Sequence, residues 1–403
     1  MSDASLLCYC YALVAFTACT RDPHSVRPRP AGSASAPAHD AAPAPPDAPD
    51  GGLLARKLPR IEYRGGPFLR HPKLVTITFA HDDPKLVLRL EQFGSAITRS
   101  NWWRMVSEGY CGKPGDCVGD GSAAHPVHLD ETLPAEVRDS ELDALLLRTA
   151  KAGRLGPIEP NTLWLVYLPK GVSLADATTR YCAGRARAFH RSLEVAGARV
   201  AYAVLPRCGD EAELTGSASH EILEATTNSF PAQHGFSFTT GSALSGFTAA
   251  GLEPVDPCGL ITMDGHWTTE SGFVVHRAWS NREAALAHDP CVPSRPDRPY
   301  VLLVPREPTV RLAHEADTVT VVLDASTAGP SKTWAISGFD LSGYQDHETY
   351  VELALDKPTV TAGESVTLSI KARKKNPAQR EIVALVSTLG VHSDMWPLLV
   401  MMR

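Results

Sequence analysis

The sequence predicts an α+β (or α/β) domain followed by a small all-β domain of immunoglobulin-like architecture. Three observations support this fold class. Between about residues 73 and 227, runs with strand-like alternation and runs with helical periodicity follow one another. From about Tyr300 onward, only short alternating runs remain. The chain has 403 residues, of which 43% are hydrophobic and 21% charged, and this composition can supply the cores of two folded domains.

The charge balance and the distribution of apolar residues exclude several protein classes. Lys and Arg number 39 against 45 Asp and Glu, which gives a net charge of −6 without a long basic block in the folded part. Nucleic acid is therefore not an expected partner. No apolar run reaches the roughly 18 residues that a membrane-spanning helix needs, so a polytopic membrane protein is not expected either.

The first 60 residues are predicted to direct export rather than to fold. Residues 1–19 contain an uncharged apolar stretch from Leu6 to Ala18, which is typical of a signal-peptide core. The stretch ends in FTAC, which is similar to a bacterial lipobox and makes Cys19 the predicted lipidation site. Residues 20–60 are rich in Pro and Ala, and this composition predicts a disordered tether. We expect an extracytoplasmic bacterial cell-envelope protein that touches the membrane only through a lipid anchor; a cleaved secretory peptide is the alternative.

Six cysteines remain in the folded part of the chain. In an oxidising compartment, an even number of cysteines indicates disulfide bonds. A structural zinc site is less expected, because the sequence has no C-x-x-C spacing. Proximity in the sequence favours three bridges: Cys111 with Cys117, Cys182 with Cys208, and Cys258 with Cys291.

Residues 61–297 are predicted to form the α+β domain. Lys73 to Ala80 alternates as a strand does, and Asp82, Asp83 and Pro84 then supply the cap and first turn of a helix. The apolar face of this helix is formed by Leu86, Leu90, Phe93 and Ile97. The further predicted elements are a helix over 140–153, buried strands over 163–168 and 199–205, a helix over 175–193 between these strands, and a helix over 214–227. A region rich in Gly, Ser and Thr follows, to about residue 293, with short strands at best.

Residues 298–403 are predicted to form the small immunoglobulin-like β-sandwich. Alternating apolar residues mark its strands, for example Val319, Val321 and Leu323, and Gly363-Glu364 supplies a turn. Modules of this kind are commonly spacers or adhesion units, so we assign it no chemistry.

One pattern in the sequence predicts chemistry. His220-Glu221-Ile222-Leu223-Glu224 is an H-E-x-x-E pattern within the predicted helix 214–227. Residues four apart share a helical face, so His220 and Glu224 can bind one cation. Glu221 stands where H-E-x-x-H metallopeptidases place the general base that takes a proton from the attacking water. The pattern therefore predicts a metallopeptidase-like domain with Glu221 as its catalytic residue.

A catalytic zinc ion usually has a third protein ligand. The downstream segment Glu253-Pro254-Val255-Asp256-Pro257-Cys258 offers two carboxylates, and either Glu253 or Asp256 could complete the site. One imidazole and two carboxylates suit zinc, but manganese and calcium also favour oxygen ligands. The metal is therefore predicted as zinc, with manganese or calcium as alternatives.

The residues of the motif also allow roles without a metal. Glu221 and Glu224 can be solvated helix residues, with His220 as a capping or core histidine. The chain lacks G-x-S-x-G, G-x-G-x-x-G and the P-loop, so serine-elbow, dinucleotide and phosphate sites have no support. Its tryptophans could stack on a sugar, although core positions are more common for them. His190 and His276 have no partner at a recognisable spacing and are predicted to be structural.

A series of residues at and after the motif carries a family resemblance: Ser219, His220, Glu221, Glu224, Asn228, Glu253, Asp256, Cys258, Trp279 and Ser280. In these residues the segment from about 73 to 293 resembles the Exordium-like, phosphate-induced protein family and its bacterial relatives. Two features depart from the family pattern: residues 228–231 read NSFP in place of Asn-Pro, and the His expected shortly after Cys182 is absent. The resemblance implies an exported protein linked to the cell surface and to growth or carbohydrate responses, with a hydrolytic activity inferred from the motif.

Together these features predict an exported, lipid-anchored metal-dependent hydrolase of the peptidase type. Its substrate would be a peptide or a cell-surface polymer. The alternative is a non-catalytic cell-surface protein that binds glycan or protein, in which the same site is structural or holds no ion.

Overall fold

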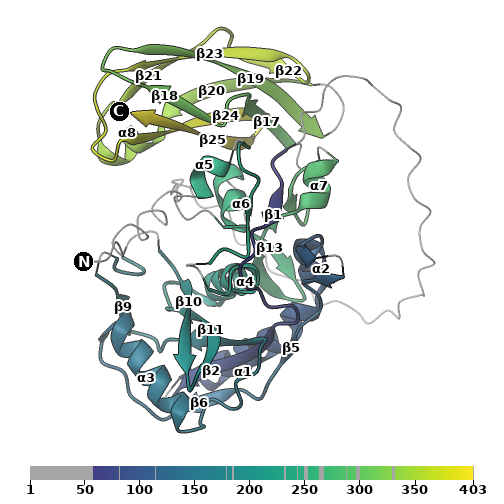
Figure 1. The fold of residues 1–403 in the computed structure, drawn as a ribbon, viewed down its shortest axis with the longest axis vertical. Coiled ribbons are helices and arrows are strands. Elements are labelled where there is room, and N and C mark those ends of the chain that lie inside the picture. Colours follow the sequence, from purple (N-terminus) through teal and green to yellow (C-terminus); the bar gives the residue numbers. More distant parts are fainter. Residues whose placement is uncertain are drawn as a thin grey trace, which may run out of the picture.

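The computed structural model describes residues 58–402, apart from gaps at 81, 114, 178, 184–185, 231–232, 243, 249–252, 263–266, 287, 296–299 and 329–331. The predicted signal peptide, the lipidation site at Cys19 and most of the tether lie outside the described residues. Figure 1 shows an α/β unit at the bottom, a β-sandwich at the top, and a layer of short elements between them.

A mixed, mostly parallel sheet forms the centre of the α/β unit. Its strand order is β10-β11-β8-β2-β5, with β6 also paired to β2, and only β10 runs antiparallel to its neighbour. The strands are β2 (Lys73–Phe79), β5 (Ser122–Ala123), β6 (Val127–Leu129), β8 (Thr162–Tyr167), β10 (Phe189–Val195) and β11 (Ala198–Leu205). The predicted strands at 73–80, 163–168 and 199–205 are therefore confirmed.

Helices cover both faces of this sheet. The three longest are α1 (Pro84–Ala96), α3 (Asp139–Lys151) and α4 (Glu211–Thr227). Leu90 of α1 and Ile222 of α4 belong to the same buried cluster as Leu165 of β8, whereas Leu145 of α3 shares a second cluster with Trp164. Because neighbouring positions on a strand point to opposite faces, α1 and α4 lie on one face and α3 on the other. The alternation in the sequence reflects this three-layer arrangement.

The start of α1 follows the predicted capping chemistry. The side chain of Asp83 accepts a hydrogen bond from the backbone N–H of Lys85, and Pro84 occupies the first turn of α1. At the start of α3, the carboxylate of Glu141 accepts a hydrogen bond from the backbone N–H of Arg138. Asp143, in the next turn, accepts a 2.5 Å hydrogen bond from the hydroxyl of Tyr202.

The predicted helix over 175–193 is wrong. In its place the chain forms β9 (Ser173–Ala175), a loop, and β10, which pairs with β11 as a hairpin. Ala196 and Gly197 both have positive φ, 51° and 84°, and this pair forms the two-residue turn that joins antiparallel strands. Helical spacing of apolar residues in this segment was a weaker guide than the Ala-Gly turn.

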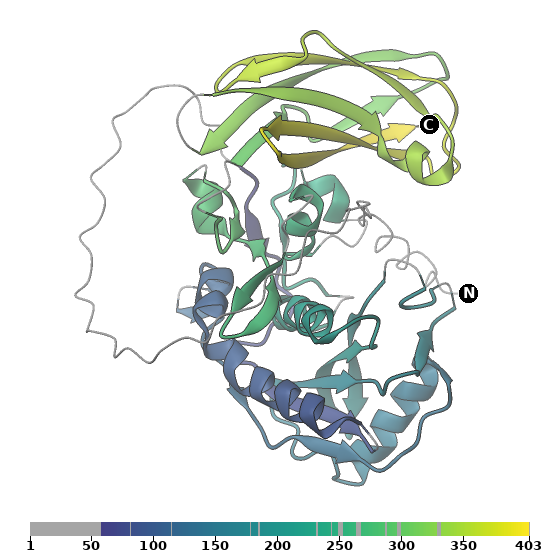
Figure 2. The same ribbon diagram turned by 180° about the vertical axis from the view of Figure 1, so that it is seen from behind.

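The middle layer is made of short elements, in agreement with the expectation for the region that ends near 293. It includes three small helices, α5 (Ser245–Thr248), α6 (Asp256–Ile261) and α7 (Asn281–Ala285). The two-stranded pairs of the chain are β1 (Ile61–Tyr63) with β12 (Phe236–Phe238), β3 (Cys111–Lys113) with β4 (Asp116–Cys117), β7 (Glu136–Arg138) with β9, β13 (Trp267–Glu270) with β14 (Phe273–His276), and β15 (Ala278–Trp279) with β16 (Cys291–Val292). A 3-10 helix, η1 (Ile97–Arg99), and α2 (Asn101–Ser107) follow α1. Figure 2 shows α4 lying between this layer and the large sheet.

The predicted disulfide bonds are confirmed. Cys111 is bonded to Cys117, Cys182 to Cys208 and Cys258 to Cys291. Three disulfides are consistent with an extracytoplasmic location. Among the described residues, none of the helices is long and apolar enough to cross a membrane.

The C-terminal part is a β-sandwich, as predicted. One sheet has the order β17-β19-β23-β21 and the other the order β18-β25-β24-β20-β22. The strands are β17 (Tyr300–Pro305), β18 (Thr309–Leu312), β19 (Thr318–Ala328), β20 (Thr333–Asp340), β21 (Val351–Leu355), β22 (Thr359–Thr361), β23 (Ser365–Ala372), β24 (Arg380–Leu389) and β25 (His392–Met402), with one helix, α8 (Leu341–Asp346). Buried and part-exposed residues alternate along β23, as expected for a sheet with one face in a core.

The sandwich and the middle layer share one hydrophobic core. Phe247 of α5 and Leu260 of α6 belong to the same buried cluster as Leu399 of β25. An isolated β-bridge also joins Thr262 to Asp394. The sandwich therefore packs directly on the segment that carries the candidate site.

Candidate metal centre

The H-E-x-x-E residues lie on α4, on the arc that faces the sheet and the middle layer. With about 100° per residue, Glu224 lies between His220 and Glu221 around the helix axis. All three side chains are buried or nearly so, and that of His220 is 15% exposed. Glu224 can therefore contact groups on either side of the helix.

His220, Glu224 and Asp256 converge. The Nε2 atom of His220 lies 3.0 Å from Oε2 of Glu224 and 3.5 Å from Oδ1 of Asp256. One donor atom of each residue lies within 4.8 Å of the other two. Zn–N and Zn–O bonds of about 2.1 Å place the donors of a tetrahedral site about 3.4 Å apart. These three side chains thus have the chemistry and spacing to hold a divalent cation.

Asp256 is held from several directions. Its Oδ2 atom accepts a 2.9 Å hydrogen bond from the backbone N–H of Glu253, which leaves Oδ1 directed at His220. Asp256 is the first residue of α6, and Cys258 in the same helix is bonded to Cys291 of β16. This disulfide bond joins α6 to β16 within the middle layer.

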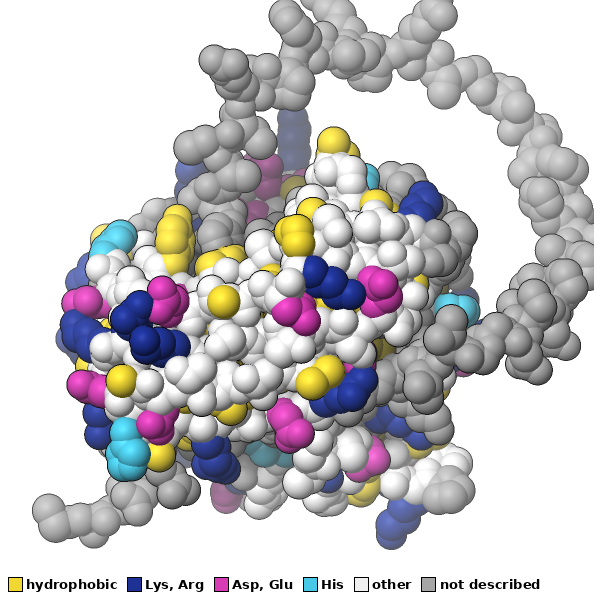
Figure 3. All heavy atoms as spheres, turned by 90° about the horizontal axis from the view of Figure 1, so that it is seen from above, with side chains coloured by type: hydrophobic (Ala, Val, Ile, Leu, Met, Phe, Trp, Pro, Cys, Tyr) yellow, Lys and Arg dark blue, Asp and Glu magenta, His cyan; other side chains and the backbone are white. Residues whose placement is uncertain are grey.

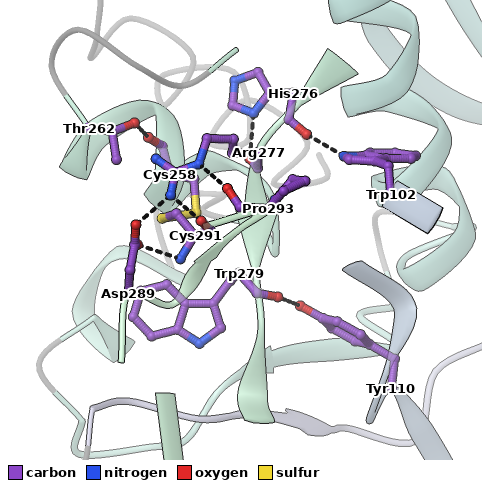
Figure 4. The surroundings of a disulfide bond; sticks show 10 residues. All are labelled: Trp102, Tyr110, Cys258, Thr262, His276, Arg277, Trp279, Asp289, Cys291 and Pro293. Carbon is purple, nitrogen blue, oxygen red and sulfur yellow. Dashed lines mark hydrogen bonds and ion pairs between the residues drawn. A yellow bond between two sulfur atoms is a disulfide. The ribbon is translucent and has the colours of Figure 1, made fainter. Parts of the chain in front are cut away.

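Figure 4 shows the surroundings of that bridge. Arg277, which is fully buried, donates hydrogen bonds to the carbonyl oxygens of Pro293 and Cys291 and pairs with Asp289. Asp289 in turn accepts from the backbone N–H of Cys291. The position of Cys258 is therefore fixed by a disulfide bond and by the Arg277–Asp289 ion pair next to it.

The two carboxylates that sequence analysis offered as the third ligand have different surroundings. Asp256 lies beside His220, whereas Oε2 of Glu253 lies 3.6 Å from Nε2 of His190. The other oxygen of Glu253 accepts a 2.7 Å hydrogen bond from the side-chain amide of Asn228. Geometry therefore favours Asp256 as the partner of His220 and Glu224.

Glu221 contacts His190 rather than solvent. Its Oε2 atom lies 3.1 Å from Nδ1 of His190, and both side chains are at most 3% exposed. Oxygen atoms of Glu221 and Glu224 lie within 4.8 Å of each other and of a His190 nitrogen. A water molecule bound beside Glu224 would therefore be within reach of the Glu221 carboxylate.

The burial of these carboxyl groups changes their acidity. Burial raises the pKa of Glu221 to about 7, although the imidazole of His220 opposes this shift. Burial and the neighbouring Glu224 charge raise the pKa of Asp256 to about 7. Burial likewise raises the pKa of Glu253, against the opposing effect of His190. A concentration of buried acids with raised pKa values is typical of sites that bind a cation or transfer protons.

Two histidines that were expected to be structural lie in or beside this centre, namely His190 and His276. His190 lies opposite Ala203 in the β10–β11 pair, and Ala203 belongs to the cluster on the α4 side of the sheet. The wrongly predicted helix hid this position; the Ala196-Gly197 turn could have placed His190 on a hairpin strand beside α4. The ring of His276 packs edge-to-face on that of His220, with centroids 4.9 Å apart, and no spacing in the sequence indicates this contact.

Trp102, Trp103 and Trp279 lie in the hydrophobic core. Trp102 and Trp103 are fully buried, and the indole N–H of Trp102 donates to the carbonyl oxygen of His276 (Figure 4). Trp279 is also fully buried, and its carbonyl oxygen accepts from the hydroxyl of Tyr110. These residues are not placed to stack on a sugar at a surface.

Comparisons with known proteins give little further information. No family model matches the chain, and no curated protein matches it. Among solved structures, a Bacteroides ovatus GH5 xyloglucanase in complex with a XXXG heptasaccharide is similar to 26% of this chain at 10% identity and a TM-score of 0.17, and the chain spans only 19% of that enzyme. A chimeric titin Z1Z2 protein is similar to 26% of the chain at 16% identity and a TM-score of 0.18, with 93% of that structure covered. Similarities of this size show no family.

Proposed function

We propose that this protein is an exported, metal-dependent hydrolase of the peptidase type, anchored by a lipid at Cys19. The observation that carries the proposal is the convergence of His220, Glu224 and Asp256, which come from α4 and α6. One imidazole and two carboxylates form a ligand set that suits zinc, and also manganese. The resemblance to the Exordium-like family supports the same function.

In this proposal each residue has a defined role. His220, Glu224 and Asp256 would hold the ion, which would polarise the scissile carbonyl and acidify the attacking water. Glu221 would take the proton from that water and pass it to the leaving amine. Its raised pKa, about 7, suits a group that must accept and release a proton near neutral pH. His190 would orient the Glu221 carboxylate through their 3.1 Å contact.

The depth of the site favours a second candidate function. Glu221, Glu224 and His190 are each at most 3% exposed, so an ion among them could be structural. The protein would then be a non-catalytic cell-surface protein that binds glycan or protein. The two candidates differ in whether Glu221 is needed for turnover.

The test measures metal content and hydrolysis together. Full-length protein is dialysed against zinc, manganese or calcium, and cleavage of fluorescein-labelled casein is followed. Wild type is expected to bind the ion and to cleave, and chelation should abolish cleavage. Glu221→Gln should retain the ion at His220 and lose about 10²- to 10⁴-fold in rate, because only the base is removed.

The matched control is Glu213→Gln, the same exchange on the same helix at a carboxylate that pairs with Arg187 instead. It should keep both metal and rate. His220→Ala should lose the ion at this site. Wild type without any bound metal would overturn the proposal, and bound metal without Glu221-dependent cleavage would favour the structural role.

A further inference from the structure

His190 carries a nitrogen that the contacts described so far do not use. Its Nδ1 atom bonds to Glu221, but Nε2 has no hydrogen-bond partner among the residues that the structure describes. The side chain is 2% exposed, so Nε2 is shielded from bulk solvent. Oε2 of Glu253 lies 3.6 Å from Nε2, which is too long for a hydrogen bond.

The arrangement around His190 is the one that metal-binding histidines adopt. A ligating histidine usually donates its other ring N–H to a carboxylate, which fixes the tautomer and leaves the second nitrogen unprotonated. Glu221 is such a carboxylate at Nδ1. With Nδ1–H donated to Glu221, Nε2 keeps a free lone pair, and Oε2 of Glu253 lies 3.6 Å from this atom.

Glu253 is oriented to meet this nitrogen. Asn228 donates to Oε1 of Glu253, and its own side-chain oxygen accepts from the backbone N–H of Phe236, so its amide cannot turn without losing a bond. This leaves Oε2 directed at His190. The distance of 3.6 Å between Nε2 and Oε2 is close to the spacing of about 3.4 Å between two donors on one tetrahedral zinc ion.

Glu224 connects this pair to the site already described. One of its carboxylate oxygens lies within 4.8 Å of a His190 nitrogen and of a Glu221 oxygen, and one lies within 4.8 Å of the donor atoms of His220 and Asp256. Two metal ions that share a bridging carboxylate lie about 3.5–4 Å apart in hydrolytic enzymes. Glu224 therefore lies between His190 and His220, which is the place of a bridging carboxylate in such a centre.

The charge of the cluster is compatible with more than one cation. The four carboxylates of Glu221, Glu224, Glu253 and Asp256 lie together with the imidazoles of His190 and His220. With neutral imidazoles and all four acids ionised, the cluster carries four negative charges, which two divalent ions would balance; without ions, the raised pKa values of Glu221, Glu253 and Asp256 favour bound protons instead. In the described part of the chain, the ion-pair partners of Glu221, Glu253 and Asp256 are histidines and not Lys or Arg.

We propose that the protein binds a second divalent cation, held by Nε2 of His190 and the Glu253 carboxylate, with Glu224 shared between the two ions. Glu221 supports this second ion indirectly, through Nδ1 of His190. The inference rests on the proposed function in that Glu224 also serves the first ion. It identifies the centre as a dinuclear one.

The experiment counts ions. Full-length protein is dialysed to equilibrium against zinc and, separately, manganese, and metal per chain is measured by elemental analysis. Wild type should hold two ions, His190→Gln and Glu253→Gln one each, and His220→Gln one. His128→Gln is the matched control and should keep two, because His128 lies on β6, where it pairs with Glu91 outside both ligand sets. Circular dichroism of each variant checks that it folds.

A spectroscopic measurement on wild type makes the test independent of the variants. Two manganese ions bridged by one carboxylate are magnetically coupled, so the six-line electron paramagnetic resonance spectrum of isolated manganese should be lost at full loading and return in His190→Gln. One ion per wild-type chain, unchanged in His190→Gln but lost in His220→Gln, would overturn the second site and leave the proposed function standing. Two ions retained in His190→Gln and Glu253→Gln would overturn this ligand assignment. Wild type without metal would overturn both proposals.

Discussion

At the scale of single residues, the candidate centre depends on buried polar groups whose orientation is set by neighbours. Asn228 is the clearest example, because it connects the end of α4 with Glu253 and with the backbone of Phe236. Asn228 is fully buried, so each of these bonds replaces water that cannot enter. Removing the amide leaves a carboxylate oxygen and an N–H without partners.

We therefore expect Asn228→Ala to lower the free energy of unfolding by about 2–4 kcal/mol, since each unsatisfied buried group costs about 1–3 kcal/mol. Urea unfolding in the presence of a chelator measures this without any contribution from metal. Asn161→Ala is the control, because the side chain of Asn161 accepts a hydrogen bond from the backbone N–H of Arg70 in an exposed setting. An equal loss in the two variants would contradict the role given to Asn228.

Another buried acid, Glu381, lies in the sandwich, outside the candidate metal centre. Burial, together with the neighbouring Asp340, raises the pKa of Glu381 to about 8, while hydrogen bonds from Ser342 and Asn376 oppose the shift. The folded state therefore holds this proton to higher pH than the unfolded chain, in which a Glu has a pKa of about 4.3. Its contribution to stability is complete below about pH 4.3 and is lost as the pH rises toward 8.

We expect the stability of wild type to fall relative to Glu381→Gln between about pH 5 and pH 8.5, because the glutamine cannot ionise. The change should be on the order of 4 kcal/mol, because about 1.4 kcal/mol is lost per pH unit between about pH 5 and pH 8. Urea unfolding at the two pH values measures it. Parallel pH dependences in the two proteins would show that Glu381 is not responsible.

At the scale of single elements, α4 carries the motif and packs between the large sheet and the middle layer. It is in contact with strands of the large sheet and with β14. Ser219 links it to that strand, because its hydroxyl accepts from the backbone N–H of His276. Gly216 lies one turn earlier, and a Cβ placed on it would overlap the indole ring of Trp267.

Two effects of Gly216→Ala oppose each other. Helix propensity alone would stabilise the variant by about 0.8–1.0 kcal/mol. Overpacking against Trp267 costs about 1–3 kcal/mol and should prevail, so we expect a net loss of stability in urea unfolding. In a Trp267→Ala background the same exchange should instead stabilise the protein. Stabilisation by Gly216→Ala in both backgrounds would contradict the close packing.

Some of the helices and strands could be predicted from sequence patterns and others could not. The strand at 73–80, the helix that begins at Pro84 and the helix that bears His220 were predictable, because capping and periodicity are local properties. The β10 strand was not predictable, because the structure of a short segment with mixed periodicity depends more on pairing with its hairpin partner than on its own propensity. The loss of β10 from the prediction also removed His190 from the candidate site.

At the scale of the whole molecule, the two predicted domains do not have separate cores. Leu399 of the sandwich and Leu260 of α6 are part of one cluster, and α6 also carries Asp256. A disturbance in the sandwich face that packs on α6 should therefore reach the metal centre. The outer face of the sandwich differs: in Figure 3 acidic and basic side chains are interspersed on it.

We expect Leu399→Asp to destabilise the protein by about 2–5 kcal/mol, because it places a carboxylate in the shared core, and to weaken metal binding at Asp256. Val391→Asp is the control on the same hairpin, where Val391 is 89% exposed. Scanning calorimetry of wild type should show one cooperative transition. Two separate transitions, with only one shifted in Leu399→Asp, would show that the sandwich and the middle layer unfold independently.

The sequence by itself determined that a unit of mixed strands and helices is followed by a β-sandwich, and it determined the three disulfide pairs and the helix that carries His220 and Glu224. Each of these features depends on local periodicity, capping or proximity along the chain. Only the tertiary structure decided that Asp256 rather than Glu253 meets His220, that His190 lies beside Glu221, and that the sandwich is joined to α6. Those contacts bring together residues separated by tens of positions, and their geometry is set by how sheet, helix and loop pack against one another. Local sequence patterns therefore do not predict these contacts.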